Sequence, residues 1–305
     1  GRWDKIVDIK KCHLQDDISN TIRNQIKKFA IENEIEFFDP YKNKGLLKSL
    51  MIKITSTKNI MVLLQFGSQS DFIYELLNFL KNSFQNINSI LYVINSKPND
   101  SIYDQKVNLF FGKDYIIEEI CGLRFKISAK TFFQTNSIQA EKLFYLVKKF
   151  LEPKKNDILY DLYTGIGTIG QILSKDVKKV VGIDVVEDSI SYAKENSKLN
   201  NLSNTKYFAG NMKDVFTEDF IKQNGKPSVS IINPPREGID KKVIEKIIDI
   251  LPKKIVYVSC NSSTLARDLV IFKKKYEISK LQTVDMFPHT SHVENVVLLK
   301  KIINV

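Results

Sequence analysis

Cys260 is the residue whose position most directly suggests chemistry. It follows the apolar, β-branched run at residues 255–258, which predicts a buried strand, and a helical pattern begins at Leu265. Cys260 therefore lies where a strand ends, and open α/β folds bind ligands at the carboxyl edge of the sheet. A thiol at that edge can attack a bound substrate. The alternative is a packed and inert cysteine, which is common for a single thiol.

A glycine-rich turn provides a second candidate site. Gly165, Gly167 and Gly170 form a G-x-G-x-x-G sequence after the strand predicted at residues 157–161. Such glycines permit a tight turn and the close approach of a ligand to the backbone. The next predicted strand ends in Asp184, 19 residues after Gly165, where a carboxylate can accept hydrogen bonds from both hydroxyls of an adenosyl ribose. The turn fits either a dinucleotide or S-adenosylmethionine.

The residues just before the first glycine separate these two ligands. Asp161-Leu-Tyr-Thr stands between the strand and Gly165, and it places a negative charge at the tip of the strand. That charge would repel the pyrophosphate of a dinucleotide, which needs a free helix N-terminus, but it suits the cationic methionine end of S-adenosylmethionine. The sequence thus favours S-adenosylmethionine, and an NAD-dependent oxidoreductase is the alternative.

Two more polar residues lie at the ends of predicted strands. Asn233 follows an apolar run and precedes two prolines, which stiffen the loop and direct an amide that is both donor and acceptor toward the cleft. Glu294 begins the last predicted strand and can serve as a carboxylate base. The alternatives are an ordinary proline-rich turn at Asn233, and a capping or salt-bridged surface acid at Glu294.

Strand and helix patterns alternate from residue 131 to the end, which is typical of a doubly wound, mostly parallel, Rossmann-like α/β sheet. The predicted strands are 157–161, 180–184, 206–209, 229–233 and 255–259, and the predicted helices are 137–151, 169–173, 189–199, 241–250 and 264–275. Residues 1–130 predict a smaller α+β domain. Its elements are strands at 6–9, 60–66 and 90–94, helices at 18–29 and 72–84, and a meander of short strands over 107–127. The segment 131–136 is the expected hinge.

Composition favours a nucleic-acid partner. The 305 residues include 46 Lys and Arg against 35 Asp and Glu, a formal charge of +11. Three cysteines (Cys12, Cys121 and Cys260) are too few for a disulfide framework, and no apolar run approaches the ~18 residues of a membrane span. No secretory signal is evident. We expect a cytoplasmic protein, a monomer, that does not enter a membrane.

Metal binding is not expected. His289 and His292 lie close to Glu294, but the third histidine, His13, belongs to the other half of the sequence. A zinc site needs three or four converging ligands.

Five stretches together resemble the S-adenosylmethionine-dependent RNA (uracil-5-)-methyltransferases. They are FFQTN at 132–136, DLYTGIGT at 161–168, NPPREG at 233–238, SCNSSTLARD at 259–268 and FPHTSHVENVVLL at 287–299. They occur in the order found in the family, and five separate motifs are far more specific than one glycine turn. The resemblance implies a class I methyltransferase domain at residues 131–305, with a mostly parallel seven-stranded sheet.

The resemblance also implies roles for individual residues. Cys260 would be the nucleophile that adds to carbon 6 of uracil, and Glu294 the base that removes the proton from carbon 5. Phe132 and Arg236 would bind the substrate. The S-adenosylmethionine site would be lined by Gln134, Tyr163, Gly165, Thr168, Asp184, Asn211 and Asn233. Many members carry Asp at the position of Asn233, and the uncharged amide argues against a direct acid–base role there.

Many family members begin with an OB-like RNA-binding domain and a four-cysteine iron–sulfur site. Residues 6–12 resemble the stretch that holds the last of these cysteines, so Cys12 is a candidate ligand whose companions would lie upstream of Gly1. Cys12 alone cannot hold a cluster, and no metal is predicted in residues 1–305. The same stretch favours 23S ribosomal RNA as the substrate, with transfer RNA as the alternative.

Two other classes of protein share part of this pattern. Amino-methyltransferases that act on adenine or glutamine also carry Asn-Pro-Pro, but an aromatic residue usually follows, where this sequence has Arg236. They also need no cysteine nucleophile. A non-enzymatic RNA-binding or assembly module could retain the fold without the activity, and methyl incorporation into RNA would exclude it.

Overall fold

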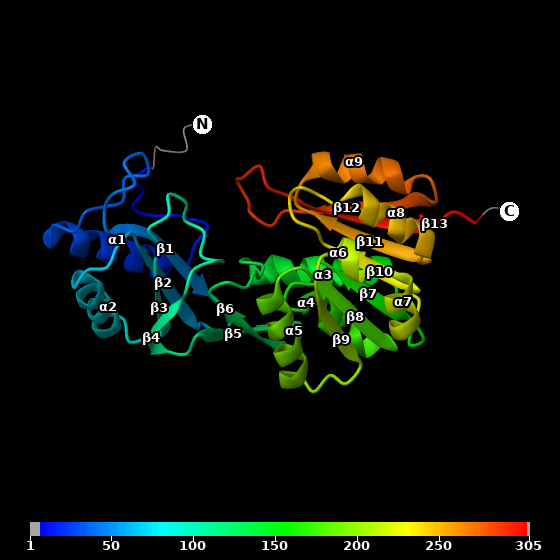
Figure 1. The fold of residues 1–305 in the computed structure, drawn as a ribbon, viewed down its shortest axis with the longest axis horizontal. Helices are drawn as coiled ribbons and strands as arrows, with labels where there is room; N and C mark the ends of the chain where they lie inside the picture. The colour runs from blue at the N-terminus through cyan, green and yellow to red at the C-terminus, as the bar shows by residue number, and fades with distance from the viewer. Residues whose placement is uncertain (1–6, 304–305) are drawn as a thin grey trace. The chain divides into compact units, whose positions relative to one another are not determined.

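The structure is a computed structural model that describes residues 7–303, and it divides the chain into two compact units (Figure 1). Unit 1 contains the described residues up to Glu118 together with Lys126–Lys130. Unit 2 contains Glu119–Phe125 and the chain from Thr131 onward. Every residue predicted to act in catalysis or to bind S-adenosylmethionine or the substrate belongs to unit 2.

Unit 1 is built on a four-stranded sheet with two long helices. The strands follow the order β1 (Leu47–Ile54), β2 (Ile60–Phe66), β3 (Ile87–Ile94) and β4 (Asn108–Gly112), and only β2 and β3 run parallel. The helices are α1 (Asp17–Glu32) and α2 (Phe72–Ser83). Ile22 and Ile26 lie one helical turn apart on α1 and pack in one buried cluster with four residues of β2, which are Ile60, Val62, Leu64 and Phe66.

The structure of unit 1 differs from the sequence prediction at three places. Strand β1 was not predicted, because its lysines and half-buried pattern hide the alternation expected of a strand. Of the strand predicted at residues 6–9, Ile6 lies outside the described residues, and residues 7–9 are not in a strand. The expected meander is divided: β4 joins the four-stranded sheet, whereas β5 (Tyr115–Ile120) and β6 (Leu123–Ser128) form a separate two-stranded sheet.

Unit 2 is built on a seven-stranded sheet in the order β12-β13-β11-β10-β7-β8-β9. The strands are β7 (Ile158–Leu162), β8 (Lys179–Asp184), β9 (Thr205–Ala209), β10 (Val229–Ile232), β11 (Lys254–Ser259), β12 (Tyr276–Val284) and β13 (Glu294–Lys301). Strands β7 to β11 are parallel, while β13 runs antiparallel to both of its neighbours. The predicted mostly parallel, Rossmann-like sheet is confirmed.

Helices cover this sheet on both faces. They are α3 (Ser137–Leu151), α4 (Thr168–Leu173), α5 (Glu187–Leu199), α6 (Met212–Val215), α7 (Glu218–Asn224), α8 (Lys241–Ile250) and α9 (Ser262–Phe272), with a 3₁₀ turn at Ser174–Asp176. On β7, Tyr160 packs in the cluster with α8 and α9, whereas the next residue, Asp161, bonds to α4. Because successive strand residues point to opposite faces, α4 and α8 lie on opposite sides of the sheet.

The sequence did not predict every element of unit 2. Strand β12 and the short helices α6 and α7 were missed, and β12 is exposed along most of its length, so it lacks the apolar run that marks its neighbours. Among the helices of residues 7–303, none combines the length and the apolar character needed to cross a membrane.

Candidate functional site

The candidate site lies at the carboxyl edge of the unit 2 sheet. Asp184 is the last residue of β8, Asn233 directly follows β10, and Cys260 directly follows β11. These strands are parallel, so their carboxyl ends meet at one edge. The structure thus brings together at one edge the residues that the sequence places at separate strand ends.

Cys260 and Glu294 come together through the pairing of β11 with β13. Ser259 pairs with Asn295 in the antiparallel register, and Asn295 Nδ2 donates to the Ser259 carbonyl at 3.3 Å. Cys260 and Glu294 are the next residues on the two chain segments, one step beyond the last pair of this register. Burial raises the pKa of the Cys260 thiol, and the Glu294 carboxylate raises it further. A thiol and a carboxylate separated by 34 positions in the sequence therefore act on each other electrostatically.

Arg236 influences both of these groups. Its guanidinium lowers the pKa of Cys260, against the effects of burial and of Glu294. Burial raises the pKa of Glu294, and Arg236 opposes that shift as well. Cys260, Glu294 and Arg236 thus form one electrostatic group, defined here as the reactive triad, in which the arginine favours the charged form of both partners.

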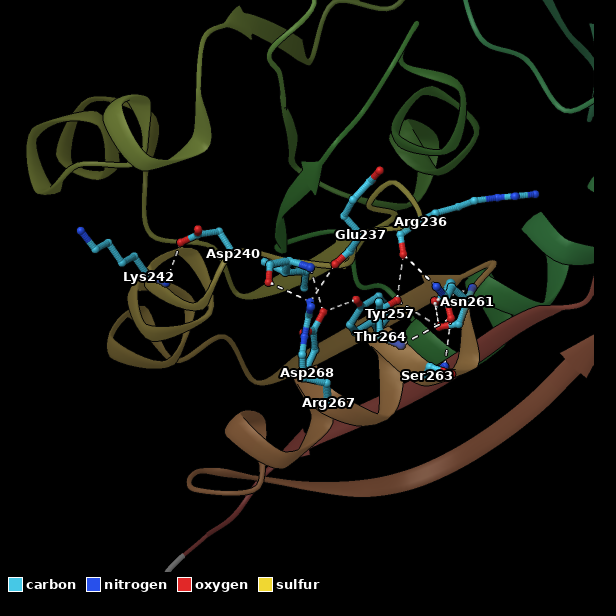
Figure 2. A network of polar contacts seen from close by, with 12 residues as sticks. Arg236, Glu237, Asp240, Lys242, Tyr257, Asn261, Ser263, Thr264, Arg267 and Asp268 are labelled. Atoms are coloured by element: carbon cyan, nitrogen blue, oxygen red, sulfur yellow. Dashed lines mark hydrogen bonds and ion pairs between the residues drawn. The ribbon is translucent and has the colours of Figure 1, made fainter. Parts of the chain in front are cut away.

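The loop that carries Arg236 is attached to helix α9 (Figure 2). The Arg236 carbonyl accepts hydrogen bonds from Asn261 Nδ2 at 3.0 Å and from Thr264 Oγ1 at 3.1 Å. Asn261 also caps α9, since its Oδ1 accepts from Ser263 N at 3.0 Å. In Figure 2 the Arg236 side chain extends away from this network. The backbone of the loop is therefore fixed while the guanidinium remains available.

A buried carboxylate completes this attachment. Asp268 has 0% of its surface exposed, and its Oδ2 accepts from Tyr257 Oη at 2.7 Å and from Ile239 N at 2.8 Å. Its Oδ1 accepts from Arg267 Nε at 2.8 Å, and Arg267 Nη2 donates to the Glu237 carbonyl at 2.8 Å. We call Tyr257, Arg267 and Asp268 the Asp268 cluster. It joins the end of the proline loop to α9 and β11.

Sequence reasoning assigned no role to the Asp268 cluster. The Arg-Asp pair closes the SCNSSTLARD stretch, and Gly238 closes NPPREG. Gly238 has φ 77°, and a Cβ there would lie 2.5 Å from Arg267 Nη2 and 2.6 Å from Asp268 Oδ2. The contact between the two motifs could have been suspected from Gly238 at the end of one motif and from the Arg267-Asp268 pair at the end of the other.

The glycine turn is held by Asp161. This carboxylate is 1% exposed, and its Oδ2 accepts from Thr164 Oγ1 at 2.6 Å and from Gly170 N at 3.0 Å. Burial raises the pKa of Asp161 to about 6. The expectation that its charge would face a ligand was wrong, because the side chain lies beneath the turn and bonds to the turn itself.

The opposite side of the turn is open. Gly165 has φ 54°, and a Cβ built on it would meet no atom within 4 Å. Its N–H donates to Asp184 Oδ2 at 2.9 Å, and Asp184 Oδ1 accepts from Val186 N at 3.0 Å. Each carboxylate oxygen can accept a second hydrogen bond. Asp184 is thus fixed in orientation and can still accept from a ligand beside the open space.

The other residues predicted to line the cofactor site have different surroundings in the structure. Within the described chain, the side-chain amides of Gln134 and Asn233 form no hydrogen bond, although both are partly buried. Tyr163 has φ 62°, and burial, followed by the charge of Asp240, raises its pKa to about 12. Thr168 is the first residue of α4. Asn211 is exposed, and its side-chain oxygen caps α6.

Three features lie apart from these residues. Phe132 is 66% exposed, as an aromatic side chain that stacks on a substrate would be. Cys12 is a free, half-buried thiol, and residues 7–303 contain no group of three His, Cys, Asp or Glu side chains that could hold a metal ion. A cavity of about 590 Å³ between α3 and the end of β12 is lined by none of the predicted site residues.

Known proteins are similar to this chain at the level of sequence. Residues 102–302 match the family model described as tRNA (Uracil-5-)-methyltransferase. An uncharacterized RNA methyltransferase of Bacteroides thetaiotaomicron is 45% identical over 304 residues, covering 98% of this chain and 67% of the relative. One of Porphyromonas gingivalis is also 45% identical, covering 98% of this chain and 65% of the relative. The chain thus spans about two thirds of the length of these curated relatives.

Solved structures agree with these matches. The Pyrococcus abyssi tRNA (uracil-54, C5)-methyltransferase, in complex with S-adenosyl-L-homocysteine, matches with a TM-score of 0.82 and 30% identity over 98% of this chain and 71% of that one. The Methanocaldococcus jannaschii tRNA m1G37 methyltransferase, at a TM-score of 0.54 and 17% identity over 85% of this chain and 76% of that one, shares the fold alone. The chain belongs to the tRNA (uracil-5-)-methyltransferase family, which confirms the resemblance found in its sequence motifs.

Proposed function

We propose that this chain transfers a methyl group from S-adenosylmethionine to carbon 5 of a uridine in RNA. The observation that carries the proposal is the reactive triad, in which Cys260 and Glu294 act on each other electrostatically and Arg236 acts on both. Family membership supports the choice of RNA uracil as the substrate. The surplus of basic residues, at +11, supports a polyanionic partner.

Cys260 supplies the activation that uracil needs. Carbon 5 of uracil is a weak nucleophile, and addition of the Cys260 thiolate to carbon 6 turns the ring into an enolate whose carbon 5 can accept a methyl group. The new sulfur–carbon bond lasts until carbon 5 loses its proton. Breaking that bond then regenerates the thiolate and restores the carbon 5–carbon 6 double bond. Arg236 favours the thiolate at both ends of this cycle.

Glu294 removes the proton from carbon 5 after methyl transfer. Burial raises the pKa of Glu294, so its carboxylate is a stronger base than an exposed glutamate. Its electrostatic contact with Cys260 puts the base and the nucleophile on neighbouring carbons of one ring. A positioned base of this kind contributes roughly 10²–10⁴-fold to a rate.

The open space at Gly165 suits the cofactor. S-adenosylmethionine, when bound, supplies the methyl group. In this proposal Asp184 accepts hydrogen bonds from the ribose, and the unpaired amides of Gln134 and Asn233 bind polar groups of the ligand. Tyr163, Thr168 and Asn211 complete the site, as the resemblance implies. These residues fit the ligand because Gly165 leaves room for it. The side-chain amides of Gln134 and Asn233 also have no hydrogen-bond partner among residues 7–303.

Phe132 binds the extruded base. Extrusion of a uridine from its stack costs a few kcal/mol, and stacking on an exposed aromatic ring returns part of that free energy. Stacking on an aromatic side chain is worth roughly 1–3 kcal/mol per base. Its 66% exposure leaves the ring of Phe132 accessible for this contact.

A trapping experiment tests the nucleophile. RNA that contains 5-fluorouridine should form a stable covalent adduct, because fluorine cannot leave carbon 5 as a cation. Cys260→Ala should form no adduct and methylate no RNA, while its affinity for S-adenosylmethionine stays close to that of the wild type. The assignment of Cys260 fails if the wild type methylates normal RNA but forms no adduct with the fluorinated RNA.

A second variant tests the base. Glu294→Gln keeps the size of the side chain but cannot take a proton, so it should accumulate protein joined to methylated RNA. Intact-mass analysis after nuclease digestion detects this species. An unmodified protein mass, together with normal turnover, would remove Glu294 from the mechanism.

The proposed RNA is 23S ribosomal RNA, supported by the similarity of residues 6–12 to the cluster-bearing stretch of the ribosomal branch. Transfer RNA is the second candidate, favoured by the similarity to the Pyrococcus abyssi tRNA (uracil-54, C5)-methyltransferase. Mass mapping of 5-methyluridine in both RNAs from cells that lack the gene decides between them. Calorimetric titration with S-adenosylmethionine and with NAD separates the proposal from an oxidoreductase.

The proposal also covers the organisation of the whole protein. We place an α+β domain at residues 1–130, the catalytic domain at 131–305, and an OB-like region with the remaining cluster cysteines upstream of Gly1. A monomer acting on RNA in the cytoplasm is part of the same proposal. Metal analysis and the mass of the full-length protein in solution test these points.

A further inference from the structure

A basic groove lies beside the edge strand of the unit 2 sheet, away from the reactive triad. Its volume is about 420 Å³, and it is formed by the last turns of α5 and by β9. The residues that matter here are Lys194, Ser197 and Lys198 on α5 and Thr205 and Lys206 on β9. We call it the α5–β9 groove.

The charge of this groove is not compensated. All three of its lysines are exposed, no acidic side chain lines it, and none of the three lysines forms an ion pair with any residue from 7 to 303. Elsewhere on unit 2 lysines do find partners, for example Lys148 with Asp176 at 2.6 Å and Lys213 with Asp240 at 2.8 Å. The α5–β9 groove is therefore a site of concentrated positive charge.

Keeping these charges together costs stability. Lys194 and Lys198 are four residues apart on one helix face, and such like-charge pairs destabilise a helix by about 0.2–0.5 kcal/mol. The charge of Lys206 also helps to lower the pKa of Lys179, after the larger effect of burial. The helix dipole favours a lysine in the last turn of α5, which accounts for Lys198 but not for Lys206. An anion in the groove would offset the repulsion.

The lysines of the groove are its donors for an oxyanion. Ser197 Oγ donates to the Leu202 carbonyl at 3.1 Å and shares a hydrogen bond with Thr205 Oγ1, so the two hydroxyls are bonded within the protein. Ammonium groups are common partners of phosphate oxygens in protein–nucleic acid contacts. Lysine supplies a mobile point charge, which suits a backbone phosphate better than a shape-specific ligand.

The groove is distinct from the catalytic edge. Strand β9 is four places from β11 in the sheet, a lateral separation of ~19 Å at the usual strand spacing. Thr205 begins β9, whereas Cys260 follows the end of β11. One nucleotide cannot reach both places, but a folded RNA that presents its uridine to Cys260 has phosphates that extend this far.

We infer that the α5–β9 groove binds backbone phosphates of the RNA substrate at a distance from the target uridine. This inference rests on the proposed function, and it adds a second point of contact on unit 2. Phosphate contacts fix the orientation of an RNA without reading its sequence. The groove therefore contributes to affinity and positioning, while the choice of uridine is made at the catalytic edge.

A charge-removal variant with a matched control tests the inference. The groove variant is K194Q/K198Q/K206Q, and the control is K273Q/K274Q/K275Q, which removes three exposed lysines of unit 2 that lie outside the groove. Affinity for fluorescein-labelled, unmodified transcripts of a transfer RNA and of a ribosomal RNA stem-loop is measured over a range of salt concentrations. Both variants carry the same net charge, so nonspecific attraction is equal in the two.

The groove variant should bind both transcripts at least ~10-fold more weakly at low salt, and its slope of log K against log salt should fall by about 2–3. The control slope should fall by less than about 1. Thermal unfolding of the groove variant should match or exceed that of the wild type, because the lysine repulsion is gone. The inference is overturned if the groove variant behaves like the wild type or like the control.

Turnover separates this result from the proposed function. With a short oligouridine at saturation, the groove variant should methylate at the wild-type rate, because the reactive triad is unchanged. If the wild type methylates no RNA, the proposed function fails, while the binding comparison still decides the groove. If the wild type methylates RNA and the groove variant binds it normally, the groove inference alone fails.

Discussion

Two loops at the carboxyl edge of unit 2 are each held by one buried carboxylate, but in different ways. The glycine turn after β7 is held by Asp161, which lies 3 positions from Thr164 and 9 positions from Gly170. The proline loop after β10 is held by Asp268. Its donors are remote in sequence, since Ile239 lies 29 positions away and Tyr257 lies 11 positions away. One loop supplies its own support, and the other is supported by the next strand and helix.

The electrostatics of the two carboxylates differ as well. Among the described residues, Asp161 accepts only from the Thr164 hydroxyl and the Gly170 N–H, and its burial raises its pKa to about 6. Asp268 faces the Arg267 guanidinium at 2.7 Å and the Tyr257 hydroxyl. The glycine turn is thus held by a carboxyl group whose pKa is about 6. The proline loop is held by the Arg267–Asp268 ion pair, which links it to the helix after Cys260.

The largest effect is expected from Asp268→Ala. The substitution leaves Tyr257 Oη and Ile239 N buried without an acceptor and Arg267 without its partner, which should lower the free energy of unfolding by about 3–5 kcal/mol. Because the loop carries Asn233 and Arg236, kcat/KM for RNA should fall as well. Urea unfolding and methyl transfer measure the two effects.

Asp268→Asn is the matched control for that experiment. Its amide oxygen can take the place of Oδ2 and accept from both Tyr257 and Ile239, but its NH₂ group cannot pair with Arg267. It should therefore lose less stability than the alanine variant. A loss below about 1 kcal/mol for Asp268→Ala would contradict a supporting role for the cluster, since a removed buried pair costs more.

Alanine substitutions of two glycines compare the loops directly. Gly238→Ala combines φ 77° with a Cβ within 2.6 Å of Asp268 Oδ2, so it should cost about 2–4 kcal/mol of stability. Gly165→Ala has φ 54° and free space, so strain alone should cost about 1–2 kcal/mol. Calorimetry should show that Gly165→Ala weakens S-adenosylmethionine binding more than Gly238→Ala does, because Gly165 borders the open space itself. Equal stability losses would remove the distinction between the loops.

The same contrast explains how much of the site was predictable. The glycine turn could be recognised because its determinants are local: a strand, three spaced glycines and a carboxylate at the end of the next strand. The burial of Asp161 was not predictable, because the sequence gives the position of a charge but not the direction of its side chain. The Asp268 cluster was missed because its partners are remote in sequence, and only folding brings them together.

The fold was predictable where burial leaves a pattern. The parallel strands β7, β8, β10 and β11 are mostly apolar and buried along most of their length, and their order along the chain indicated the sheet. Strand β12 was not predicted, because an exposed edge strand needs no apolar run. The electrostatic contact of Cys260 with Glu294 could not be predicted from the sequence, since it depends on the antiparallel register of β11 with β13.

A smaller effect is expected from Asp161→Asn, and it should depend on pH. The pKa of Asp161 is raised from 3.8 to about 6, so the folded protein holds this proton more tightly than the unfolded chain. Between about pH 4 and pH 6 the stability of the wild type therefore falls as pH rises, because the unfolded chain ionises first. Below this range both states are protonated, so the stability that the protonated group contributes is fully present and no longer changes with pH.

The asparagine variant removes this dependence while its oxygen can still accept from Thr164 and Gly170. Relative to the wild type, its free energy of unfolding should rise by on the order of 2 kcal/mol between pH 4 and pH 7. Urea unfolding at several pH values measures the difference. Parallel curves for the two proteins would show that Asp161 is not the proton-binding group. Asp268→Asn should not show the same gain, because it loses its pair with Arg267.

The smallest effect is expected from Thr264→Val, which removes one of two hydrogen bonds to the Arg236 carbonyl. Valine keeps the branched shape, and Asn261 Nδ2 still donates to the same oxygen at 3.0 Å, so stability should fall by only about 0.5–1 kcal/mol. Thr264→Ser keeps the hydroxyl and should restore the wild-type value. A large fall in kcat/KM without a fall in stability would mean that Thr264 holds Arg236 in place for the reaction, so that even a single bond to this loop matters for catalysis.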